Sequence, residues 1–148
     1  MSEEALAILQ AQETLQIAGR AVTVRELTFG QSLALHGDIA PVIAALLPRY
    51  DSAEGIDSEH IIDAMAVWPD LALRLLALTT GESADWLQAL SEREGYLVLL
   101  HFARVNAPFF VTRLEMALQT ARARRDRMAT IPAPSLPASC ATDTAPMH

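Results

Sequence analysis

The sequence contains no lysine, and arginine supplies all eleven of its Lys/Arg-type basic residues. The absence of lysine excludes a Walker-type phosphate loop, Schiff-base chemistry and a serine–lysine dyad. The single cysteine, Cys140, has no second thiol with which to form an intrachain disulfide or a cysteine metal cluster, as is usual in a reducing compartment. Aromatic residues make up only 5% of the chain, so any core must be built mainly from alanine, leucine, isoleucine and valine.

Long apolar runs and an excess of positive charge are also missing. The longest apolar stretches, such as residues 42–47, cover barely two helical turns, whereas a membrane-spanning helix needs about 18–20 residues. Residues 1–4 lack the positive charge with which a secretion signal begins. The net charge of −7 argues against a protein that coats nucleic acid or an anionic membrane with its whole surface. We therefore expect a soluble chain inside the cell.

A β-hairpin is predicted near the N-terminus, at about residues 14–27. Apolar and polar residues alternate on both sides of Ala18 and Gly19, and β-branched residues occupy many of the alternating positions. Before it, residues 2–14 are predicted to form a short helix or arm, with Ser2 as a candidate N-cap.

Helix signals follow the hairpin as far as residue 128. Thr28 and Gln31 form a capping-box pattern that starts the first helix, which we expect Gly37 to end or kink. Asp38 is the candidate N-cap of the next helix, and Pro41 is tolerated in its first turn. Further apolar faces with a spacing of three or four residues begin near Ser58, Pro69, Ser83, Ser91 and Pro108.

These patterns predict a mainly α domain over residues 1–128, with about six helices and the N-terminal hairpin. Between residues 129 and 148, prolines are mixed with alanine, serine and threonine, and little apolar surface is left to offset the entropy of ordering. We therefore expect a disordered, proline-rich C-terminal tail over residues 129–148.

The sequence shows no pattern of a catalytic, cofactor or metal site. His36, His60 and His101 lack the i, i+4 spacing that would preorganise a metal site on one helix. His60 and Asp63 are three residues apart, but such pairs are common on helix surfaces. Paired carboxylates fall at helix starts or in loops, where they favour the helix dipole and solubility. We therefore expect a protein that is not an enzyme and binds no cofactor or metal.

Arginines gather at the end of the last predicted helix. Residues 1–119 carry seven arginines and sixteen acids, whereas residues 120–128 carry four arginines and one acid. Such a cluster suits a solvated helix end, an acidic protein partner or phosphate groups. Its members are Arg122, Arg124, Arg125 and Arg127.

Two adjacent aromatic residues, Phe109 and Phe110, lie near the start of the same helix. Neighbouring positions on a helix point about 100° apart, so both rings cannot enter one core. Phe110 continues an apolar stripe through Leu114 and Leu118. We therefore expect Phe110 in the core and Phe109 on a partner-binding surface.

Three stretches of the sequence have distinctive residue patterns. They are residues 22–31 (VTVRELTFGQ), residues 68–90 with TTGES at 79–83, and residues 105–110 (VNAPFF). Together they resemble tailed-phage tail assembly chaperones, also called pre-tape-measure proteins. The resemblance covers about residues 15–118, and the Asn-x-x-Phe-Phe element is its most distinctive part.

The resemblance implies a non-enzymatic bacteriophage or prophage protein of the host cytoplasm that serves in viral tail assembly. Such a chaperone binds the tape measure protein and keeps it soluble while tail tube subunits polymerise around it. The implied partners are the tape measure protein, the tail tube protein and further copies of the chain, without a membrane. We assign partner binding to Phe109 and the four clustered arginines, which we expect to contact acidic protein and not phosphate. The alternative function is a small helical nucleic-acid-binding regulator that uses these arginines.

Overall fold

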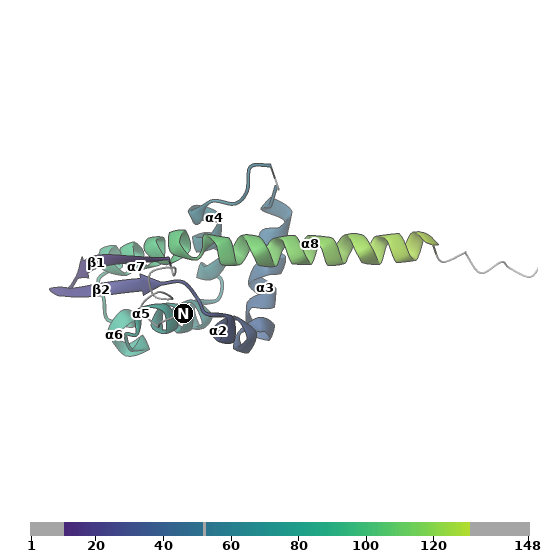
Figure 1. The fold of residues 1–148 in the computed structure, drawn as a ribbon. Helices are drawn as coiled ribbons and strands as arrows, with labels where there is room; N and C mark the ends of the chain where they lie inside the picture. The colour runs from purple at the N-terminus through teal and green to yellow at the C-terminus, as the bar shows by residue number, and fades with distance from the viewer. Residues whose placement is uncertain (1–10, 52, 131–148) are drawn as a thin grey trace, which may run out of the picture.

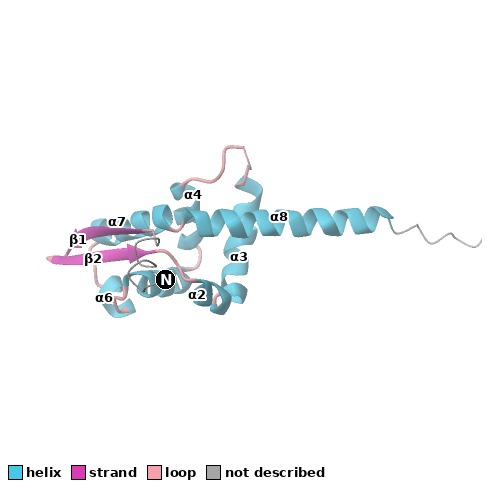
Figure 2. Ribbon diagram, in the orientation of Figure 1, coloured by secondary structure: helices cyan, strands magenta, loops and turns pink. Residues whose placement is uncertain are grey.

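A computed structural model describes residues 11–51 and 53–130 of the chain. These residues form a two-stranded hairpin and seven α-helices, which confirms the predicted mainly α fold (Figures 1 and 2). The elements are β1 (Gln12–Ile17), β2 (Arg20–Arg25), α2 (Phe29–Ala34), α3 (His36–Leu46), the 3₁₀ turn η1 (Leu47–Arg49), α4 (Ser58–Ala66), α5 (Pro69–Thr80), α6 (Ala84–Gln88), α7 (Glu92–Val105) and α8 (Ala107–Thr130).

The hairpin lies at one end of the molecule, where it packs on α5 and α7, and α6 packs against α5 at the same end (Figure 1). Helix α4 packs on both α7 and α3, and α3 in turn contacts α8. Helix α8 crosses α3 and then continues beyond the other described elements (Figure 1). The first part of this long helix therefore belongs to the body, and its second part projects from it.

The hairpin closes through a two-residue turn at Ala18 and Gly19, whose φ angles are 51° and 78°. Two positive φ values are the geometry of a type I′ turn, which matches the right-handed twist of the strands. The predicted boundary was about residue 14, but the strand begins at Gln12, which pairs with Arg25. Residues 12–14, predicted within the arm, are therefore in the sheet because the ladder extends to both ends of β2. Residues 1–10 lie outside the described part of the chain.

The break between the first two helices is not at Gly37, as predicted, but at Leu35. The Thr28–Gln31 capping box that starts α2 is present with both of its hydrogen bonds. Leu35 is buried in the core, and the chain turns there, so α3 begins at His36 and Asp38 lies inside its first turn. The expectation that Asp38 caps this helix was therefore wrong.

The later helix boundaries follow the sequence signals closely. Asp57, Ser83 and Ser91 each accept the backbone N–H three residues ahead, as N-caps do. Gly81 ends α5 in the left-handed conformation with a φ of 76°. Helix α8 continues to Thr130, so the first two residues of the predicted tail are helical. The rest of that tail, residues 131–148, lies outside the described residues.

One buried amide joins the hairpin to the last two helices. Asn106, the only asparagine in the sequence, ends α7 and is fully buried. Its side-chain oxygen accepts the Leu27 N–H at 2.8 Å, and its NH₂ group donates to the carbonyls of Arg25 and Phe102 at 3.2 Å each. Its own carbonyl accepts the N–H groups of two residues in the first turn of α8, Phe109 and Phe110. Asn106 thereby fixes where the hairpin leaves the sheet and where α8 begins.

We predict that Asn106→Ala lowers the free energy of unfolding by about 3 kcal/mol, because it removes three hydrogen bonds and leaves the buried Leu27 N–H unpaired. Asn106→Asp keeps the acceptor but loses both donors, so it should also destabilise the fold. Urea denaturation measures both effects. Gln119→Ala, which truncates an exposed amide on α8, is the matched control and should change stability by less than about 0.5 kcal/mol. Equal stability of Asn106→Ala and the control would contradict this role.

Candidate functional site: a groove beside the last helix

A stripe of residues along α8 faces α2 and α3. The residues recur every three or four positions, so they share one side of the helix. They are Phe109, Thr112, Arg113, Met116, Ala117, Thr120, Ala121 and Arg124.

Two adjoining hollows lie between this stripe and the opposite helices. The first hollow, of about 450 Å³, lies beside α2, and the second, of about 470 Å³, lies beside α3. Both are lined by His36, Arg113 and Met116, so they form one continuous depression that we call the α8 groove. Its wall opposite α8 consists of Glu26, Leu27, Thr28, Phe29, Ser32, Leu33, His36, Ile39, Ala40, Ile43, Ala44 and Leu47.

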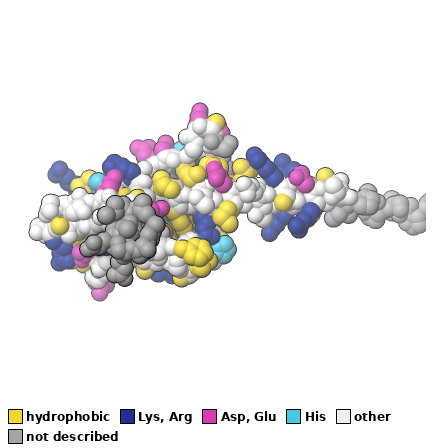
Figure 3. Space-filling view, in the orientation of Figure 1, with side chains coloured by type: hydrophobic (Ala, Val, Ile, Leu, Met, Phe, Trp, Pro, Cys, Tyr) yellow, Lys and Arg dark blue, Asp and Glu magenta, His cyan; other side chains and the backbone are white. Residues whose placement is uncertain are grey.

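The groove is apolar and open. Phe29, Leu33 and Met116 are 77%, 58% and 55% exposed, although large apolar side chains are usually buried. Figure 3 shows the corresponding apolar patch over α2, next to a histidine side chain. In the second hollow the walls carry small side chains, with Ala40 and Ala44 facing α8. Small side chains on packed helices leave room that a larger side chain from another molecule can fill.

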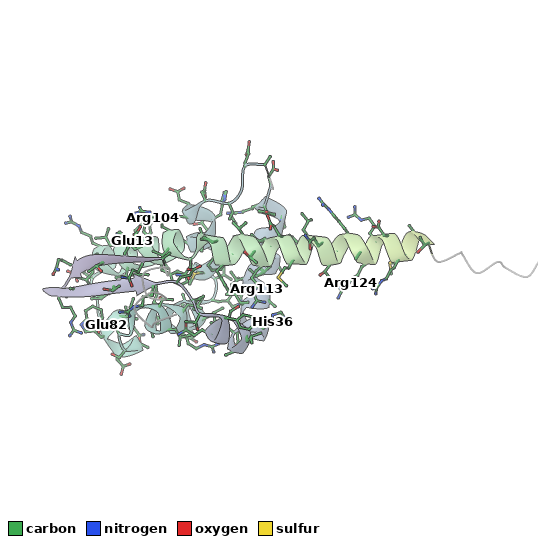
Figure 4. The ribbon with its side chains drawn as sticks, in the orientation of Figure 1. Glu13, His36, Glu82, Arg104, Arg113 and Arg124 are labelled. Atoms are coloured by element: carbon green, nitrogen blue, oxygen red, sulfur yellow. The ribbon has the colours of Figure 1, made fainter. Side chains whose placement is uncertain are left out.

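Arg113 lies between the two hollows and ties α8 to the opposite wall. One guanidinium nitrogen donates to the Nδ1 atom of His36 at 2.5 Å, and another donates to the Ser32 carbonyl at 3.1 Å and to the Ser32 hydroxyl. A guanidinium can only donate, so Nδ1 of His36 is the acceptor of this bond. The guanidinium carbon also lies 5.5 Å from the centre of the Phe109 ring, within the range of a cation–π contact. Figure 4 shows Arg113 and His36 close together below α8.

The predicted arginine cluster divides over the surface of α8. Arg124 lines the second hollow, and Arg127, three residues further on, points to the same side of the helix. Arg122 and Arg125 point away from that side by the same geometry. All four arginines are exposed on the projecting part of α8, where Figure 3 shows basic side chains on both of its edges. The structure therefore brings only part of the cluster to the groove.

The two phenylalanines occupy different environments, in line with the sequence analysis. Phe110 is fully buried, and its ring stands at 83° to that of Phe102 with centroids 6.2 Å apart. Phe109 is half-buried, lines the first hollow and contacts Phe110 edge to face at 5.2 Å.

Sequence reasoning missed most of the groove. The Thr28–Gln31 box predicts only that a helix begins here, although the i, i+4 spacing of Phe29 and Leu33 puts both on one side of α2. Arg113 and Met116 gave no separate signal, because an isolated arginine or methionine on a helix is common. The spacing of Phe29 and Leu33 was the signal available in the sequence, and the structure shows its consequence, because α2 buries none of its six residues and leaves these apolar side chains for another surface.

Other charged clusters hold the body together at a distance from the groove. Glu13 of β1 contacts His101 and lies 3.6 Å from Arg104, both on α7 (Figure 4). Arg20 pairs with Glu82 at 2.8 Å, and its guanidinium lies 4.5 Å from the centre of the Trp86 ring. These contacts tie the hairpin to α5–α7.

On the other side of α8, the Tyr50 hydroxyl donates to Glu115 at 3.2 Å. Loss of hydration and the Glu115 carboxylate raise the pKa of this phenol above its ordinary value. No group of three histidine, cysteine or acidic residues suited to a metal ion occurs in residues 11–51 and 53–130. Within the same ranges, no single helix has the length and apolar content to cross a membrane, although α7 and α8 meet that test as a pair bent by 55°.

The fold and the groove define a mainly helical protein with an apolar, basic-edged surface beside its longest helix. The chain belongs to a family of unknown function, DUF6631, whose sequence profile matches residues 5–148. Neither the curated proteins nor the solved structures contain a match to the chain.

We predict that Phe110→Ala lowers the free energy of unfolding by about 3–5 kcal/mol, because it empties a fully buried site. Phe109→Ala removes a half-buried ring and should cost about 1 kcal/mol. Urea denaturation of the two variants compares the same substitution at adjacent positions. If Phe109→Ala destabilised the fold as much as Phe110→Ala does, the ring would belong to the core and not to the groove.

Proposed function

We propose that this protein is a bacteriophage or prophage tail assembly chaperone, which acts in the host cytoplasm and binds the tape measure protein through the α8 groove. The observation that carries the proposal is the open apolar groove with arginines along it. Exposed apolar patches of this kind mark sites of protein interaction. Non-enzymatic binding, with the tail tube protein and further copies of the chain as additional partners, belongs to the same proposal.

The segments that resemble tail assembly chaperones support this use of the groove. Residues 22–31 and 105–110 are far apart in the sequence, but the 2.8 Å hydrogen bond between Asn106 and Leu27 brings them together. Side by side, they supply one end of the groove, with Phe29 from the first segment and Phe109 from the second. The most distinctive part of the resemblance therefore coincides with the candidate binding surface.

A long helical partner suits such a surface. Amphipathic helices bind by laying their apolar side into a hydrophobic groove, and a tape measure protein presents many such segments before the tube encloses it. The net charge of −7 on the chain keeps complexes apart by repulsion, while the second hollow of the groove is apolar and carries basic side chains without an acid. This combination would hold an aggregation-prone helical protein in solution.

We predict that co-expression with the tape measure protein of the same genome raises the soluble fraction of that protein, and that Leu33→Asp abolishes the effect. Leu33 is 58% exposed in the groove, so a carboxylate there should leave the fold intact and obstruct apolar binding. Val67→Asp, at a 66% exposed position outside the groove, is the matched control and should retain capture. No gain in solubility with the unsubstituted chain would contradict the proposed function.

The exposed arginines on the projecting helix favour one alternative, a nucleic-acid-binding regulator. The four arginines lie on different sides of α8, so paired substitutions on each side can distinguish the two functions. The variant pair Arg124→Glu/Arg127→Glu changes charge on the groove side, whereas Arg122→Glu/Arg125→Glu makes the same change elsewhere.

We predict that the groove-side pair weakens capture of the tape measure protein about tenfold more than the other pair does. Phosphate binding, in contrast, should depend on total charge, so both pairs would reduce it similarly and with a steep dependence on salt. Pull-down yields and duplex DNA titrations at several salt concentrations measure the two effects. Micromolar, salt-dependent DNA binding that both pairs abolish, without any effect on capture, would favour the regulator.

A further inference from the structure

The α8 groove has two apolar hollows with a cation between them. Along α8 the first hollow is centred near position 112 and the second near position 119, as judged from their lining residues. A helix rises 1.5 Å per residue, so the centres lie roughly 11 Å apart, about two turns of helix. Arg113, which lines both hollows, lies between these centres.

None of the hydrogen bonds found for the Arg113 guanidinium in the described part of the chain goes to a carboxylate. Within residues 11–51 and 53–130 its acceptors are His36 and the carbonyl and hydroxyl of Ser32. Guanidinium groups form their strongest hydrogen bonds to carboxylates, often through two parallel N–H groups. An acidic side chain placed in the groove would therefore offer Arg113 a stronger acceptor than those it has now.

The charges around the second hollow point to the same partner. Its lining includes Arg113, Arg124 and His36 but no acidic residue. The two arginines are eleven residues apart, so they share one side of α8 and lie roughly 16 Å from each other. This hollow is therefore complementary to a segment that is both apolar and negatively charged.

We infer that the α8 groove recognises an acidic amphipathic helix in which two large apolar side chains lie seven residues apart, with an aspartate or glutamate between them paired to Arg113. This inference rests on the proposed function and specifies the kind of segment in the tape measure protein that binds the groove. Residues i and i+7 of a helix are about 10.5 Å apart and share a side, as do residues i+3 and i+4 between them. The apolar pair fills the two hollows and the acid reaches the cation between them.

A synthetic helix tests the pattern without any phage protein. The acidic probe is a 17-residue alanine-based peptide with a fluorescent label, leucine at its fifth and twelfth positions and a single glutamate at its eighth. The neutral probe is the same peptide with glutamine in place of that glutamate. We expect the acidic probe to bind the full chain by fluorescence anisotropy, and the neutral probe to bind about tenfold more weakly. Moving the second leucine of the acidic probe to the tenth position, which takes it off the shared side, should weaken binding at least as much.

Variants of the protein locate the contact. With Arg113→Gln the acidic and neutral probes should bind equally, because the cation that distinguishes them is gone. Arg113→Lys keeps the charge but not the planar pair of donors, and should restore only part of the difference. Arg93→Gln, on α7 outside the groove, is the matched control and should keep the tenfold difference. Arg113 also donates a hydrogen bond to the Ser32 carbonyl, so its substitution could destabilise the fold, and the melting temperature of each variant is measured as a control. The comparison of the acidic and neutral probes does not have this problem, because it uses the unsubstituted protein.

Other outcomes of these experiments would reject the inference, reject the proposed function or give the groove a different occupant. Equal binding of the acidic and neutral probes to the unsubstituted chain would overturn the inference while leaving capture of the tape measure protein, and so the proposed function, intact. Peptide binding with the expected pattern but no capture would retain the inference and reject the chaperone function. Concentration-dependent dimerisation abolished by Leu33→Asp would assign the groove to a second copy of the chain. Binding that appears only after removal of residues 1–10 or 131–148 would assign it to the termini, and either result would overturn the inference.

Discussion

The buried side chain of Asn106 is the interaction on which the arrangement of the other elements depends. A primary amide can accept and donate hydrogen bonds at the same time, and here it accepts from the Leu27 N–H while it donates to the carbonyls of Arg25 and Phe102. Its backbone carbonyl starts α8. Because these bonds lie in a fully buried position, any displacement of the hairpin relative to α7 and α8 would leave polar groups unpaired away from water.

The same residue sets the direction of α8. The axes of α7 and α8 differ by 55° across Asn106, and Phe110 and Leu114 then anchor the first turns of α8 in the core. From position 119 to position 130 every residue is exposed. An isolated helix of about twelve residues is only marginally stable in water, since nucleation is unfavourable. Here the anchored turns supply the nucleus, so the outer turns extend an existing helix, and the groove acquires a wall that is fixed at one end and accessible along its length.

Local signals allowed much of the fold to be predicted from sequence, because they act within a few residues. The Thr28–Gln31 box, the caps at Asp57 and Ser83 and the glycine at Gly81 each satisfy backbone groups of their own helix. The break at Leu35 could not be predicted in this way, since it follows from burial of a side chain in a core that distant elements complete. The groove could not be predicted for a related reason: it forms between helices that are distant in the sequence, and its shape depends on how they pack. Alanines such as Ala40 and Ala117 look in sequence like ordinary helix formers, and only their placement opposite one another leaves a hollow.

The exposed apolar groove and the net negative charge of the chain have opposite effects on association. An exposed groove with Phe29, Leu33 and Met116 favours association between identical chains. The net charge of −7 opposes that association over the whole surface, but it would also repel an acidic partner. Arginines beside the groove reverse the sign locally, so the acidic helix that we infer would be attracted at short range despite the net charge of the whole chain. The absence of acids from the second hollow is therefore as important for selectivity as the presence of Arg113 and Arg124.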